Sequence, residues 1–218
     1  MKVDEFEKQL IEELNKMSNE DIIRFARLCA LRTLPFIGAK GNFDYWVVKD
    51  RMKHLYSVFQ FLEMIDSYLL NNYSTRPAWD IRRKTDFILI RISDKTSALA
   101  INAIWSATYV PHFADECIKK KHDNIFVVAY ANSASTASYL ATLIFWGEYE
   151  KMQRIILEDI KAIQKGQTVF NNHKGLFGHI WDIFLQALDK EGCSYWGHLL
   201  KEYLKTLFNW IRKHLKNG

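Results

Sequence analysis

The sequence predicts an all-α fold, a helical bundle of about seven to nine helices in a single domain that spans residues 1–218. The chain contains only three Pro and nine Gly residues, so few turns interrupt it and its elements should be long. Apolar residues recur at three- and four-residue spacing over most of its length. Two long stretches, 96–110 and 124–147, contain no charged residue and are rich in Ala and Ser. These stretches predict two buried helices with amphipathic helices around them.

The first two helices are predicted from a capping pattern and an apolar face. Ser18 and Asp21 resemble a capping box, so a helix should begin near Asn19. It should stop or kink at Leu34–Pro35, because proline disfavours a helical residue before it. The preceding segment forms an amphipathic helix whose apolar face contains Val3, Phe6, Leu10, Leu14 and Met17.

The middle of the chain predicts two more helices and contains one ambiguous segment. A helix should extend from Tyr45 to about Asn71, since this range lacks Gly and Pro. Residues 79–92 fit either a helix or a short strand at 87–92, and their basic start favours helix. The next helix begins after Asp94, has a strong helix composition in Ala, and should end at Pro111.

The uncharged stretch 124–147 raises the question of a membrane span, because about 20 apolar residues are enough to cross a bilayer. Five polar residues at its centre argue against a span. A linker would contain Gly or Pro, and a reactive serine would need a strained elbow such as GxSxG, which is missing. A hairpin of two strands stays possible for this stretch, because residues 125–130, IFVVAY, are rich in strand formers. The alanines favour a helix buried on most of its circumference and packed against 96–110, with hydroxyls bonded to i−4 carbonyls.

Three further helices are predicted towards the C-terminus. Residues 149–166 place Tyr149, Met152, Ile156, Ile160 and Ile163 on one face, and Gly166 stands where a C-terminal capping glycine belongs. Residues 179–192 and 194–218 form two more amphipathic segments. The seven tryptophans all lie in apolar helical patterns, which favours core or groove positions over a ligand pocket.

No constellation of residues predicts a catalytic, metal or cofactor site. His198 and Glu202 are four residues apart, but a metal site needs three or four convergent ligands. His112, Asp115 and Glu116 fit a helix start with acids in its first turn. Glu158 and Asp159 are adjacent, point in different directions and should be solvated. Nucleotide-binding glycine motifs are absent, and the three widely spaced cysteines indicate reduced thiols in a cytoplasmic protein.

The last helix predicts a partner-binding surface, which we call the basic ridge. It lies opposite the apolar stripe of that helix and could dock an acidic protein or, less favourably, nucleic acid. A solvated face is the alternative. Basic runs at 82–84 and 119–121 could extend it. The ridge consists of Lys201, Lys205, Arg212 and Lys216.

Residues 25–37, FARLCALRTLPFI, followed by the uncharged ALAINAIWSA and ANSASTASYLA segments, resemble a helical immunity-protein family of bacterial polymorphic toxin systems. The resemblance implies a cytoplasmic, mainly α-helical protein that neutralises a cognate toxin by binding it, without a cofactor and outside the membrane. It carries no set of functional residues across. The basic net charge of +5 suits a toxin surface that is acidic or of mixed charge.

The sequence therefore predicts a non-enzymatic immunity-type protein. Two alternatives stay open: a helical nucleic-acid-binding module that uses the basic ridge, and an enzyme of unrecognised type with a Trp-lined pocket between helices. The sequence does not predict the identity of the toxin, the interface or the oligomeric state.

Overall fold

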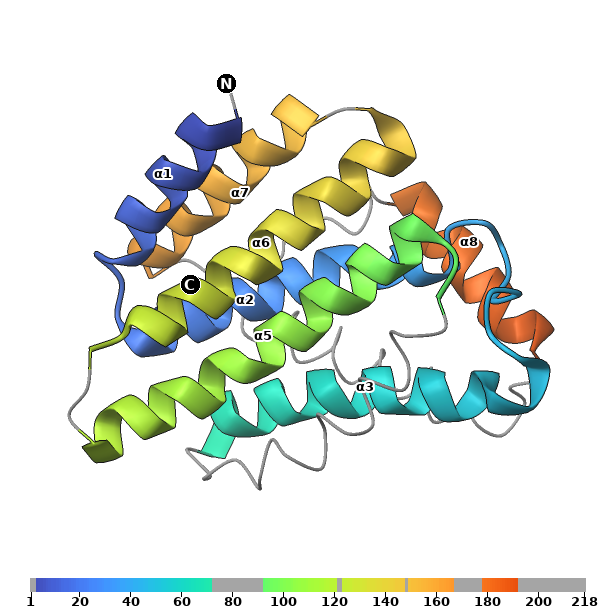
Figure 1. Cartoon of the computed structure of the whole chain (residues 1–218), viewed down its shortest axis with the longest axis horizontal. Helices are drawn as coiled ribbons and strands as arrows, with labels where there is room; N and C mark the ends of the chain where they lie inside the picture. The colour runs from blue at the N-terminus through green and yellow to red at the C-terminus, as the bar shows by residue number, and fades with distance from the viewer. Residues whose placement is uncertain (1–2, 72–91, 121–122, 148, 167–177, 192–218) are drawn as a thin grey trace.

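The computed structural model describes residues 3–71, 92–120, 123–147, 149–166 and 178–191. In that part of the chain it contains only helices, which confirms the all-α fold (Figure 1). They are α1 (Val3–Leu14), α2 (Asn19–Thr33), the 3-10 helix η1 (Leu34–Gly38), α3 (Val48–Asn71), α5 (Lys95–Lys120), α6 (Ile125–Trp146), α7 (Tyr149–Gln164) and α8 (Gly178–Lys190).

Helix α2 lies at the centre of the bundle and contacts α3, α5, α6, α7 and η1. It begins as predicted, because the Ser18 hydroxyl accepts a hydrogen bond from the backbone N–H of Asp21 at 3.2 Å. Most of its residues are buried, including Phe25, Ala26 and Ala30. The predicted stop at Leu34–Pro35 is also confirmed, since the chain tightens there into η1.

The chain at η1 approaches α8 so closely that one position requires glycine. A Cβ atom added to Gly38 would lie 2.9 Å from the Phe184 ring and 3.2 Å from the Phe43 ring. Phe43 and Phe184 pack edge to face, with ring centroids 6.2 Å apart. The absence of a side chain at Gly38 therefore allows η1 to dock against this aromatic pair.

Helix α5 does not end at Pro111, so that prediction was wrong. It continues to Lys120 with Pro111 inside it. Proline removes one backbone hydrogen bond, but the turns that follow are held by packing, because Ala114 and Cys117 are buried and Phe113 stacks on Tyr130 of α6. His112, Asp115 and Glu116 consequently lie inside a helix and do not begin one.

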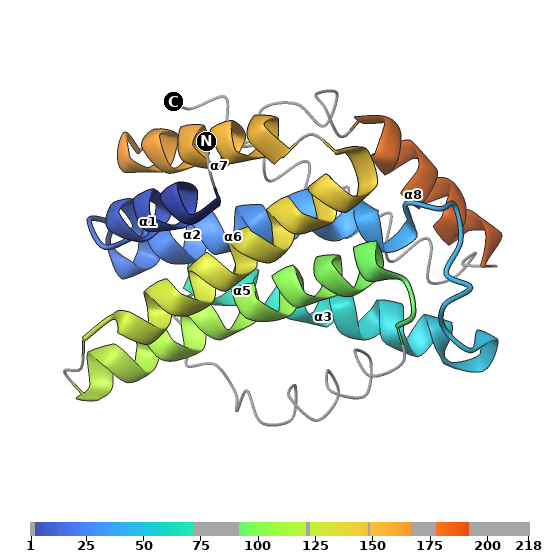
Figure 2. The ribbon, with the colours of Figure 1, turned by 45° about the horizontal axis from the view of Figure 1, so that its top comes forward.

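Helices α5 and α6 make the most extensive contact among the described elements, which confirms that the two uncharged segments pack together. Helices α1 and α7 lie side by side against α2 and α6, while α3 covers the other side of α5 (Figures 1 and 2). Helix α8 lies at the end of the bundle against η1. The buried residues of all these elements form one hydrophobic core.

The buried faces of α1 and α7 agree with the faces predicted from the sequence, and glycines end α6 and α7. Phe6, Leu10, Leu14 and Met17 are buried, as are Met152, Ile156, Ile160 and Ile163. Gly147 and Gly166 have φ values of 72° and 70° just after α6 and α7, where the left-handed conformation favours glycine.

Several predictions fall outside the described residues. They concern the ambiguous segment up to residue 91 and the final helix from 194, and the single domain over the whole chain therefore stays a prediction. Among the helices that the structure does describe, none combines the length and the hydropathy needed to cross a membrane.

Candidate protein-binding surface

The predicted basic ridge cannot be placed, because Lys201, Lys205, Arg212 and Lys216 lie outside the described residues. The 82–84 run and the His198–Glu202 pair also lie outside them. In the basic run 119–121, Lys119 is exposed near the end of α5, and its ammonium group lies 2.6 Å from the Asp115 carboxylate. The nucleic-acid alternative, which depends on the ridge, stays a prediction.

The structure instead reveals a surface on α6 that the sequence analysis did not predict. Ile125, Phe126, Ala129, Ser133 and Ile144 are exposed, and none of them is charged. Ile125 is 66% exposed, Phe126 57% and Ile144 50%. We call these five residues the α6 face. Every other α-helix in the described ranges has at least one charged residue at an exposed position, so α6 differs from the rest of the bundle.

The buried side of α6 combines small and hydroxylic residues with a few larger ones. Its inner side contains small and hydroxylic residues, among them Ala131, Ala134, Ser135, Ser138 and Thr142, all buried. Small residues at these positions leave room for α5 and α2 to pack against α6. Val127, Val128 and Tyr139 are buried as well, whereas Ile125, Phe126 and Ile144 are exposed. The prediction of a helix buried on most of its circumference is confirmed, and the exposed residues occupy one narrow strip of it.

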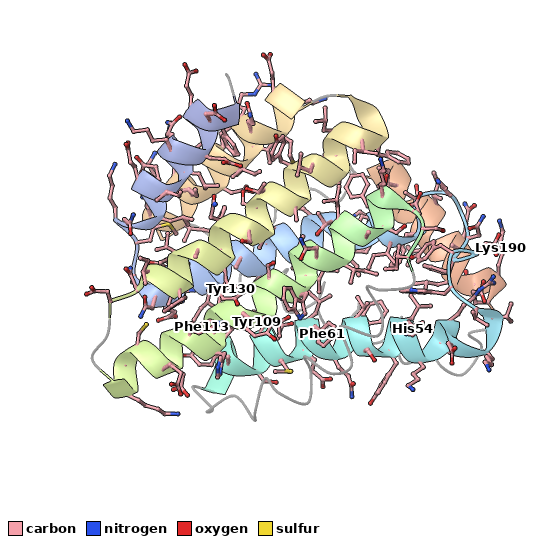
Figure 3. The ribbon with its side chains drawn as sticks, in the orientation of Figure 1. His54, Phe61, Tyr109, Phe113, Tyr130 and Lys190 are labelled. Carbon is pink, nitrogen blue, oxygen red and sulfur yellow. The ribbon has the colours of Figure 1, made fainter. Side chains whose placement is uncertain are left out.

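An aromatic stack extends the α6 face onto α5. The Phe113 ring is nearly parallel to the Tyr130 ring at a centroid distance of 4.9 Å and to the Phe126 ring at 5.3 Å. Tyr109 stacks on Tyr130 at 5.0 Å, and Trp105 meets Tyr109 edge to face at 4.9 Å. In Figure 3, Tyr109, Phe113 and Tyr130 lie together where α5 and α6 are adjacent. Tyr109 is buried, whereas Trp105, Phe113 and Tyr130 are half-buried, so the stack connects the α6 face to the core.

Ile118, near the end of α5, is also an exposed apolar residue, but it lies on a different side of that helix from the aromatic stack. Large exposed apolar areas on otherwise polar proteins mark interaction sites, and aromatic side chains are enriched in their energetically dominant positions. The α6 face and the adjoining aromatic stack therefore have the character of a protein-binding surface.

On the buried side of α6, the Ser135 side chain lies near the buried Cys29 thiol of α2. The hydroxyl of Ser135 lies close to the Cys29 thiol, without a partner in hydrogen-bond geometry. Ser138 and Thr136 likewise have no partner, whereas Thr142 bonds the Ser138 carbonyl at 3.1 Å. The predicted i−4 bonding of the hydroxyls is therefore confirmed for Thr142 and wrong for the other three.

Arg32 of α2 and Asp159 of α7 form a buried bidentate ion pair, with N–O distances of 2.8 and 2.7 Å. Their side chains are 16% and 5% exposed. Burial raises the pKa of Asp159 to about 6, although Arg32 acts in the opposite direction. The prediction that Glu158 and Asp159 are both solvated is thus wrong for Asp159, and Glu158 alone is exposed.

The buried polar side chains described above lack the properties of catalytic groups. Burial raises the pKa of the Cys29 thiol well above its usual range, so the thiol lacks the thiolate character of a nucleophile. Within the described ranges, no group of three or more His, Cys, Asp or Glu side chains is arranged to hold a metal ion. Trp46 and Trp181 are buried in the core, as the sequence predicts for tryptophans in apolar patterns.

Comparisons of the chain with known protein families, with curated proteins and with solved structures found no match. The site described above therefore has to be interpreted from its own chemistry.

Proposed function

We propose that this chain is an immunity-type protein that neutralises a cognate bacterial toxin by direct, non-covalent binding. The observation that carries the proposal is the combination of the uncharged α6 face with the aromatic stack of Phe113, Phe126 and Tyr130. The sequence resemblance to helical immunity proteins agrees with it. A stoichiometric inhibitor needs a stable scaffold and a surface that excludes water from a partner, and it needs no reacting centre.

The contacts suggest which residues contribute most of the affinity. Hot spots are concentrated in aromatic residues near the centre of an interface, and less energetic contacts around them exclude water. Phe126 is more than half exposed yet held by its contact with Phe113, so it can insert into a partner with little loss of side-chain entropy. We expect Phe126 to be the principal contact with the toxin.

Co-expression of the chain with the toxin encoded by the adjacent reading frame tests the proposal. Wild-type chain should protect the cells and co-purify with the toxin. Phe126→Asp should weaken binding by at least about 30-fold, the effect of losing a hot spot of about 2 kcal/mol. Val48→Asp is the matched control, because Val48 is a 71% exposed apolar residue on α3. Unchanged toxicity and no co-purification with the wild-type chain would reject the proposal.

A further inference from the structure

We infer that the toxin surface bound by the α6 face is basic, with an apolar centre that covers α6 and with Lys or Arg side chains that lie opposite α1. This inference rests on the proposed function and specifies the chemistry of the partner. It differs from the expectation of an acidic or mixed-charge toxin surface, which was based on the net charge of the whole chain.

Helix α1 borders the α6 face on the side opposite the aromatic stack. The Phe6 ring of α1 meets the Tyr139 ring of α6 edge to face, with centroids 5.8 Å apart, whereas Tyr130 of α6 stacks on rings of α5. Tyr130 and Tyr139 are about two and a half turns apart, so they point to opposite sides of the helix. The exposed residues Ala129 and Ser133 lie on the outer side between them. In Figures 1 and 2, α1 and α5 accordingly lie on opposite sides of α6.

The flank of α1 that faces α6 carries acidic and apolar side chains. The Gln164 amide, just at the end of α7, donates a hydrogen bond to the Glu13 carboxylate at 3.2 Å, so the Glu13 flank of α1 faces α7. Glu7 and Ile11 lie beyond the other edge of the buried stripe of α1, on the flank towards α6, and Asp4 lies on the same flank. Asp4 is exposed, and Ile11 is 38% exposed. Ile11 therefore continues the apolar surface of the α6 face, while Asp4 and Glu7 make its edge negative.

The net charge of α1 is the largest of any described α-helix. It contains five acidic residues and one lysine, a net charge of −4, whereas the other described α-helices have net charges between −1 and +1. The described residues together contain 17 Lys and Arg and 21 Asp and Glu, a net charge of −4 (17 − 21). The positive net charge of the whole chain is thus carried by other residues, and the helix beside the α6 face is acidic.

This distribution of charge selects the kind of partner. Opposite charges around an apolar centre speed association, and like charges brought together suppress wrong partners. An acidic toxin surface, a nucleic acid or an anionic membrane surface would meet like charge along α1. The exposed apolar side chains of α6 alone do not suffice for tight binding, because association loses translational and rotational freedom. Arg side chains opposite Asp4 and Glu7 would supply further contacts, since the guanidinium group bonds a carboxylate in bidentate geometry.

Association kinetics of the full chain with the purified toxin test the sign of this charge. Asp4→Lys combined with Glu7→Lys should slow association about tenfold at low ionic strength, because electrostatic attraction raises association rate constants. The dissociation rate should change less. Added salt should slow the association of the wild type and reduce its difference from the variant, because salt screens exposed charges.

Two further variants separate charge from folding and from overall charge. Glu63→Lys combined with Asp182→Lys is the matched control, because it makes the same change at exposed positions on α3 and α8, and it should associate nearly like the wild type. Asp4→Asn combined with Glu7→Gln removes the charges with little change of shape. It should slow association by a smaller factor, so a folding defect in the Lys variant cannot mimic the result.

The inference and the proposed function fail separately. If the wild-type chain binds the toxin but Asp4→Lys combined with Glu7→Lys associates equally fast or faster, the basic partner is overturned and the neutralising function stands. A faster variant would indicate an acidic toxin surface. A wild-type chain that binds no toxin rejects the proposed function and with it this inference.

Discussion

Substitution of Asp159 by Asn tests whether burial or ion pairing controls the ionisation of this carboxyl group. Burial raises its pKa from 3.8 to about 6, even though Arg32 bonds both carboxylate oxygens. The folded state therefore binds this proton more tightly than the unfolded state does. The stability that the group contributes is fully present below pH 3.8 and is lost as the pH rises through 6.

The size of the effect follows from the two pKa values. A difference of about two between them corresponds to about 3 kcal/mol in the free energy of unfolding between pH 4 and pH 7. Asn resembles the protonated carboxyl group in shape and cannot ionise. Asp159→Asn should therefore match the wild type in stability near pH 4 and exceed it by up to about 3 kcal/mol at pH 7.

Urea unfolding at several pH values between 4 and 7 measures this difference directly, because all other titrating groups are common to the two proteins. Asp182→Asn, which removes a carboxylate at an exposed position on α8, is the matched control for the substitution itself. A wild-type protein that gains stability over Asp159→Asn as the pH rises would refute the reasoning, since pairing with Arg32 would then outweigh burial.

Three further predictions follow from local contacts and charge. Ser18→Ala removes the hydroxyl that accepts the hydrogen bond from the Asp21 N–H and should lower the free energy of unfolding by about 1 kcal/mol in urea titrations. An unchanged unfolding midpoint would show that this hydrogen bond contributes nothing to stability. Gly38→Ala forces a methyl group to within 2.9 Å of the Phe184 ring and should lower the stability measured by thermal unfolding by about 1–3 kcal/mol, and an unchanged melting temperature would contradict this. Charge reversal of the basic ridge should abolish any salt-sensitive binding of the chain to nucleic acid, and the lack of binding by the wild type at low salt would reject that alternative function.

The parts of the fold that the sequence predicted correctly depend on local interactions. The Ser18 cap and the buried stripe of α7 involve residues within a few positions of one another, so periodicity and capping chemistry are sufficient to find them. The continuation of α5 through Pro111 depends on the packing of Phe113 against Tyr130 of α6. Contacts between segments that are not adjacent in sequence are not visible in a single chain, and the predicted end of this helix was wrong for that reason.

The candidate site was less predictable than the fold. Absence of charge shows that a helix is compatible with burial, but not which of its sides meets water. On α6 Val127 and Val128 are buried while Ile125 and Ile144 are exposed, and residue type alone does not distinguish the two pairs. The Arg32–Asp159 pair joins residues 127 positions apart, and nothing in the local sequence distinguishes the buried Asp159 from the exposed Glu158.

The exposed apolar residues of α6 set a limit on what this face alone can contribute to binding. Complete burial of an Ile or Phe side chain contributes about 1.5–3 kcal/mol. Covering the exposed parts of Ile125, Phe126 and Ile144 therefore yields about 3–5 kcal/mol. Loss of translational and rotational freedom opposes association by about 4–15 kcal/mol. A protein that binds this face tightly must therefore add contacts beyond these three side chains, and variants of neighbouring exposed residues should weaken binding as well.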